Sequence, residues 1–159
     1  MKNFLTAFLL LLASVPVSGQ IPERRNAKEE ARIEKVLTDF LDAWNKHDAK
    51  AFAGVFAEEA DFTNVRGVSA HGRSEVEKLY APLFATRFKD THQNIARSTV
   101  RFIKPDVAGV DAWWEMTGAK SPEGQEMPPR KGLLNFVMTK NNDVWLIAVM
   151  HNMDLPAAP

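Results

Sequence analysis

Three polar side chains stand in apolar surroundings in this sequence, and they are the first candidates for chemistry: Asn64, Tyr80 and His151. His151 follows the apolar run VWLIAVM and carries the one side chain of the three that can exchange a proton near neutral pH. It is therefore a candidate general acid or base. The alternative is a structural histidine, bonded to a backbone carbonyl or to Tyr80 and holding the end of a strand.

Asn64 lies within FTNVRG, where one amide is set among apolar and β-branched residues. An amide cannot abstract a proton at neutral pH, but it can hold the carbonyl or hydroxyl of a ligand in an apolar cavity. Asn also favours turns, so the alternative is that Asn64 fixes the turn that follows it. Tyr80, the only tyrosine, could orient Asn64 or a ligand, or it could anchor its own helix.

Other chemistries find little support in the sequence. The chain has no Cys, which excludes disulfides, thiolate chemistry and Cys-ligated metals. No two of the four histidines have the H-x-H or H-x-x-x-H spacing of a metal site, and the glycines form no phosphate-binding loop. The 20 basic residues balance 20 acidic ones, which argues against a nucleic-acid partner. We predict no metal and no cofactor.

The N-terminus is typical of an export signal. Lys2 precedes the apolar run FLTAFLLLLASV, and the small residues Val17-Ser18-Gly19 suit cleavage before Gln20. The run is shorter than the ~20 residues that a membrane span needs. We predict a signal peptide over residues 1–19, a flexible leader over 20–27, one domain over 28–155 and a tail over 156–159. The mature protein is expected in the periplasm or outside the cell, without a membrane anchor.

The elements that must position the candidate residues begin with helices. Apolar residues recur at helical spacing between residues 33 and 44, which predicts an amphipathic helix. Asp48 is suited to cap a second, shorter helix, and Ser74 with Glu77 fits the capping box of a third. A first strand is predicted over residues 61–66, with a connector over residues 69–72.

Strands dominate the second half of the chain. Alternating patterns predict strands over residues 92–103, 107–117, 131–140 and 144–153, with turns at residues 104–106 and 141–143. A long polar loop, GAKSPEGQEMPP, separates the second and third of them. Three N-terminal helices followed by antiparallel strands predict an α+β fold, in which the helices cover one face of a curved, mostly antiparallel sheet.

Three segments carry a family resemblance: LDAWNKHDAKAFAGVFAEEADFTNVRG, HGRSEVEKLY and VWLIAVMHN. They resemble the SnoaL-like branch of the nuclear transport factor 2-like superfamily, close to its SgcJ/EcaC "oxidoreductase" group, over most of residues 29–154. The resemblance implies a cone-shaped fold. It leaves the function open, because this scaffold hosts isomerases, cyclases, dehydratases and binding modules. The chain has no dinucleotide fingerprint that would support an oxidoreductase.

Similarity to ketosteroid isomerase, a catalytic relative by fold, places Asn64 where that enzyme has its base. Phe40 and Leu134 fall where it has its oxyanion donors, a Tyr and a protonated Asp. None of the three can take these roles, so isomerisation by that route is excluded.

The resemblance, combined with strand alternation, also implies which side chains face the cavity of the cone. On the last strand these would be Trp145, Ile147, Val149 and His151. The ligand-binding set that follows consists of Asn64, Tyr80, Trp114, Phe62, Phe136 and Trp145. Trp113 would face the opposite side of the sheet, where relatives commonly dimerise.

These observations leave three hypotheses. In the leading one, an exported protein binds a small, largely apolar molecule in its cavity and forms a homodimer. In the second, the protein is a cofactor-independent acid-base enzyme of isomerase, cyclase or dehydratase type that uses His151. In the third, it is a dimerisation or assembly module without catalysis.

Overall fold

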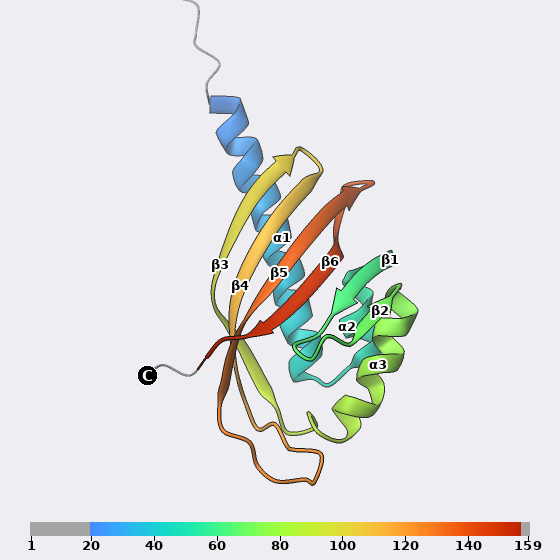
Figure 1. The fold of residues 1–159 in the computed structure, drawn as a ribbon. Helices are drawn as coiled ribbons and strands as arrows, with labels where there is room; N and C mark the ends of the chain where they lie inside the picture. Colours follow the sequence, from blue (N-terminus) through green and yellow to red (C-terminus); the bar gives the residue numbers. More distant parts are fainter. Residues whose placement is uncertain (1–19, 157–159) are drawn as a thin grey trace, which may run out of the picture.

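The computed structural model describes residues 20–156, and the predicted signal peptide lies outside them. Three helices precede most of the sheet (Figure 1): α1 (Gln20–Asn45), α2 (Ala49–Gly54) and α3 (Arg73–Ala85). The strands are β1 (Phe56–Thr63), β2 (Ser69–His71), β3 (His92–Lys104), β4 (Val107–Thr117), β5 (Arg130–Asn141) and β6 (Val144–Asp154). The predicted α+β architecture is confirmed.

Helix α1 lies against one face of the curved sheet and buries the predicted apolar stripe, including Ile33, Leu37 and Phe40. It already begins at Gln20, so the prediction of a flexible leader over residues 20–27 is wrong. Extending an existing helix costs far less than starting one, and Pro22 falls in the first turn, where proline is tolerated.

The two shorter helices begin in different ways. The Asp48 side chain accepts a hydrogen bond from the Ala51 N–H at 2.9 Å, which confirms the predicted cap of α2. The capping box predicted for α3 is wrong, because Gly72 takes the N-cap position with φ of 82° and offers no side chain. The Glu75 carboxylate instead accepts from the His71 N–H at 2.9 Å.

The six strands form one sheet in the order β2-β1-β6-β5-β4-β3. Strands β3 to β6 are antiparallel neighbours close to their predicted limits, and β1 runs parallel to β6. The predicted connector over residues 69–72 contains β2, and β1 begins before residue 61 because it also pairs at Phe56. Among residues 20–156, no helix is long and apolar enough to cross a membrane.

A β-bulge changes which side chains of β6 face inward. Met138 pairs with Ile147, but the preceding residue, Val137, pairs with Val149, so Ala148 is the extra residue. One added residue reverses the alternation beyond it. Trp145 and Ile147 face inward as predicted, but the inward orientation predicted for Val149 and His151 is wrong. Met150 and Asn152 take those positions.

Aromatic rings fill much of the interior. Phe52 and Tyr80 have ring centroids 4.6 Å apart, and Phe40 lies 5.8 Å from Phe136. Phe56 and Phe62 continue this cluster at 6.1 Å. This part of the domain is packed core, so an internal cavity can lie only beyond it.

Candidate functional site

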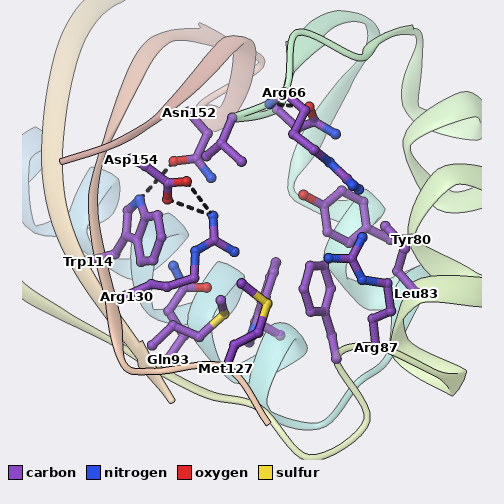
Figure 2. Close-up of a pocket in the computed structure, with 15 residues that line it drawn as sticks. Arg66, Tyr80, Leu83, Arg87, Gln93, Trp114, Met127, Arg130, Asn152 and Asp154 are labelled. Atoms are coloured by element: carbon purple, nitrogen blue, oxygen red, sulfur yellow. Dashed lines mark hydrogen bonds and ion pairs between the residues drawn. The ribbon is translucent and has the colours of Figure 1, made fainter. Parts of the chain in front are cut away.

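One cavity, of about 220 Å³, lies between the end of α3, the turn after β1 and the inner faces of β3 to β6 (Figure 2). Its apolar wall consists of Trp44, Val65, Leu83, Phe88, Trp114, Met116 and Met127. Its polar lining consists of Asn64, Arg66, Tyr80, Arg87, Gln93, Arg130, Asn152 and Asp154. The cavity therefore combines an apolar interior with an unexpectedly charged border.

The structure brings together three of the six residues predicted to bind a ligand: Asn64, Tyr80 and Trp114. Phe62 and Phe136 do not line this cavity, because their rings are packed in the aromatic core. Trp145 is also elsewhere, with its indole N–H donating to the Glu29 carboxylate at 2.7 Å. Large aromatic side chains fill the space that the sequence assigned to the ligand.

Asn64 takes both of the roles that its sequence context left open. Its side-chain oxygen accepts hydrogen bonds from the N–H groups of Arg66 at 2.9 Å and Val68 at 3.1 Å, which fixes the turn. The residue also lines the cavity. Since the oxygen is occupied, the amide nitrogen is the group that Asn64 can offer to a ligand.

His151 lies on the outer side of the sheet, exposed, in a shallow groove with Asp61, Thr63 and His71. It is not among the residues that line the cavity, and Tyr80 is not its partner. Its predicted place in the cavity is therefore wrong, because the bulge at Ala148 turns it outward. The Nδ1–H of the neighbouring His71 donates to the Asp61 carboxylate at 2.8 Å, and this contact raises the pKa of His71.

Three arginines that the sequence analysis did not single out line the cavity: Arg66, Arg87 and Arg130. Figure 2 shows Arg66 and Arg87 on one side of the hollow and Arg130 facing them from the other. Alternation along β5 could have identified Arg130, which has the same parity as the buried Leu134. Arg66 and Arg87 lie in a turn and just after a helix, where no periodic pattern indicates the direction of a side chain.

Among the residues whose side chains the structure describes, a carboxylate lies close to just one of these arginines. Arg130 forms an ion pair with Asp154, at 2.6 and 2.7 Å to its two oxygens, and its guanidinium lies 5.7 Å from the centre of the Trp114 ring. The Trp114 indole in turn donates to Asn152 at 2.8 Å. Arg130, Asp154, Trp114 and Asn152 thus form a connected wall (Figure 2).

Burial and charge perturb two other lining residues. Desolvation, followed by repulsion from Arg66 and Arg130, lowers the pKa of Arg87. Burial raises the pKa of the Tyr80 hydroxyl well above its ordinary value, so this group is a neutral donor or acceptor.

Gln93 completes the polar lining from β3. Its backbone exchanges two hydrogen bonds with the Asn45 side chain, at 2.8 and 2.9 Å. Its side-chain oxygen is buried and has no hydrogen-bond partner within the described part of the chain. A buried acceptor of this kind is unfavourable unless something else supplies a donor.

The comparison with protein families agrees with this architecture. The SnoaL-like domain family matches residues 37–132. The chain belongs to the SnoaL-like family. Among curated proteins, none matches this SnoaL-like chain.

Solved structures show the same fold. An uncharacterized protein with a cystatin-like fold from Caulobacter vibrioides is 24% identical, with a TM-score of 0.75 over 80% of this chain and 89% of that one. A domain of unknown function from Nostoc punctiforme is 25% identical, with a TM-score of 0.71 over 80% and 78%. Hexachlorocyclohexane dehydrochlorinase LinA-type3 from Novosphingobium barchaimii is 14% identical, with a TM-score of 0.75 over 83% and 90%.

The side chains that line the cavity of this SnoaL-like protein are better suited to binding a molecule than to transferring protons. Asp154 is the one carboxylate among the described residues that line it, and Arg130 holds it in an ion pair. Tyr80 keeps its proton, and an arginine does not give one up near neutral pH. The lining offers hydrogen-bond donors, cationic groups and apolar walls.

Proposed function

We propose that this SnoaL-like protein binds a small, largely apolar molecule in the cavity beside Tyr80 and Trp114. The observation that carries the proposal is a hollow of about 220 Å³ with an apolar wall, beside a core of buried apolar side chains, many of them aromatic. Protein interiors are close-packed, and few voids larger than a water molecule persist in them. A cavity of ~150 Å³ is enough to hold benzene, so this one has room for a substituted ring.

An acid-base enzyme is the second candidate, favoured by the likeness in fold to the hexachlorocyclohexane dehydrochlorinase. Such an enzyme needs a side chain that can accept a proton at the bound molecule. His151, the group that the sequence offered for this role, lies outside the cavity, and Asp154 is bound by Arg130. Binding therefore has the stronger support.

The proposal is tested with the three cresols, which are neutral single-ring molecules, by calorimetric titration of the chain from Gln20 onward. We expect at least one cresol to bind and the substitution Met127→Trp, which fills the cavity, to weaken that binding about tenfold or more. Met153→Trp is the matched control, because Met153 is exposed and does not line the cavity. Equal affinities of the two variants for the cresol that binds would refute the proposal, and so would a failure of every single-ring probe, neutral or charged, to bind the unmodified protein.

We also infer that the mature protein is exported and works as a homodimer through the outer face of the sheet. Trp113 is half-buried on this face, and the Arg97 guanidinium stacks on its ring at 3.4 Å from the centroid. Trp and Arg are enriched at protein interfaces. Sedimentation velocity tests the inference, and a monomer at micromolar concentration would contradict it.

A further inference from the structure

We propose that the molecule bound in the cavity is an anion: a single ring that carries a carboxylate, placed between Arg66 and Arg87, and a hydroxyl or N–H group that donates to Gln93. This inference rests on the proposed function and specifies the class of ligand. Three features of the cavity carry it: an excess of positive charge, an unpaired buried acceptor, and the size of the space.

The charges that line the cavity are unbalanced. The lining contains three guanidinium groups and one carboxylate, although the chain as a whole has equal numbers of basic and acidic residues. Asp154 is taken by Arg130, which leaves Arg66 and Arg87. The general composition therefore does not explain why arginines gather here.

Arg66 and Arg87 have no close acidic partner. Neither forms an ion pair with any acid in residues 26–156. The side chain of Arg87 donates from Nε to the Lys120 carbonyl at 3.2 Å, and Glu123 attracts it only from a longer distance, being bonded to Ser121. Figure 2 shows both guanidinium groups directed into the hollow on the same side. Two neighbouring positive charges that repel each other, one of them on the partly desolvated Arg87, favour an anion between them.

Gln93 gives an independent reason to expect a polar ligand. Only 4% of the residue is exposed, and it lines the cavity. Its backbone groups are committed to Asn45, while the side-chain oxygen lacks a donor. A ligand hydroxyl or N–H would supply the missing hydrogen bond and remove the cost of burying an acceptor without a partner.

The walls between these polar groups define the middle of the ligand. Leu83 and Phe88 border the cavity near Arg87, Trp114 borders it beside Arg130, and Met127 is a further lining residue (Figure 2). A volume of about 220 Å³ suits one ring with its substituents rather than a fused polycyclic body. Aromatic and thioether walls are well suited to the faces of such a ring.

The experiment compares the three hydroxybenzoates with the three matching hydroxybenzamides, which have nearly the same shape but no charge. Calorimetric titration at low salt is expected to show that at least one hydroxybenzoate binds about tenfold or more tightly than its amide. Arg66→Gln and Arg87→Gln should each reduce this preference at least threefold and leave the affinity for the amide nearly unchanged. Arg101→Gln, an exposed arginine of β3 outside the cavity, is the matched control.

Gln93→Leu tests the second polar contact with the same probes. In the unmodified protein the best hydroxybenzoate should bind more tightly than benzoate, and Gln93→Leu should abolish that advantage while benzoate binding is retained. If the hydroxybenzoate still binds more tightly than benzoate after this substitution, Gln93 does not accept a hydrogen bond from the ligand. That result would overturn this half of the proposal.

The outcomes separate this inference from the function on which it rests. One contrary result is that cresols or hydroxybenzamides bind as tightly as hydroxybenzoates, and another is that the preference for hydroxybenzoates over their amides persists in both arginine variants. Either result refutes the claim that the ligand is an anion, and the binding function stands. If none of the three series binds, the proposed function fails and the inference fails with it. The Arg66 variant keeps the test decisive should Arg87→Gln fold poorly, because Arg66 is exposed and its turn is held by Asn64.

Discussion

The carboxylate of Glu29 is bound by three side chains far from the cavity. It accepts hydrogen bonds from Trp145 at 2.7 Å, from Lys140 at 3.0 Å and from Arg32 at 3.0 Å. The Trp145 hydrogen bond lowers the pKa of Glu29 most, and the two positive charges lower it further, against the opposing effect of burial. These contacts join α1 to β5 and β6.

Glu29→Gln should lower the free energy of unfolding by ~1–2 kcal/mol near neutral pH, because it removes the charge from these hydrogen bonds. A depressed pKa means that the folded state binds fewer protons than the unfolded state in the acid range. The contribution of Glu29 is therefore present above its ordinary pKa and is lost as the pH falls through the lowered value.

Urea unfolding of the unmodified protein and the Glu29→Gln variant tests this prediction near neutral pH and at about pH 3. The difference in free energy of unfolding between the two proteins should be smaller at the lower pH. Glu30→Gln is the control, since Glu30 is exposed on the same helix. An equal difference in free energy of unfolding at both pH values would show that the charge of Glu29 does not contribute to stability.

The elements differ in how far the sequence determines them. The limits of β3 to β6 follow from alternating residues and from turn residues such as Asn142 and Asp143, which adopt positive φ. The bulge at Ala148 could not be predicted, because one extra residue leaves the apolar composition of β6 unchanged while it reverses the faces beyond it. This is why Asn152, and not His151, lines the cavity.

The site was predictable only where periodicity or the family resemblance reaches it. Trp114 on β4 and Tyr80 on α3 were found because strand or helix periodicity directs them inward, and Asn64, in the turn after β1, because the family resemblance implies that it faces the cavity. Arg66 and Arg87 were missed because the directions of side chains in turns and helix ends depend on tertiary contacts. Gln93 was missed because a buried glutamine is rare, so a sequence pattern does not favour it.

Gly132 shows how closely β5 approaches the wall of the cavity. A Cβ atom at this position would overlap the Trp114 ring and the Met153 carbonyl. Gly132→Ala should therefore lower the free energy of unfolding by ~1–3 kcal/mol and displace Trp114, which also weakens cresol binding.

Gly54→Ala provides the matched control for that prediction, because a Cβ atom there meets nothing within 4 Å. It should leave stability unchanged or raise it slightly, since alanine restricts the unfolded chain more than glycine does. Urea midpoints and cresol titrations of the two variants make the comparison. If both variants behave alike, the close packing of β5 on Trp114 is not present in solution.

The molecule as a whole divides its interior between a packed part and a hollow part. Phe52 is fully buried, with its ring 4.8 Å from that of Phe40 and 5.7 Å from that of Phe56. Leu83 is half-buried, and it lines the cavity. A side chain that faces a void has fewer partner atoms to lose, so stability should depend on the packed part and ligand binding on the hollow part.

Truncation at the two positions tests this division. Phe52→Ala should lower the free energy of unfolding by ~3–5 kcal/mol, as expected when a large side chain leaves a closed core. Leu83→Ala should lower the free energy of unfolding by less than half as much, because the neighbours of Leu83 already border open space. The same substitution should change cresol affinity, because it enlarges the cavity. Urea unfolding and calorimetric titration of both variants provide the measurements. If Leu83→Ala cost as much as Phe52→Ala, the hollow would have to be collapsed in solution, because only a side chain packed on all sides loses that many contacts.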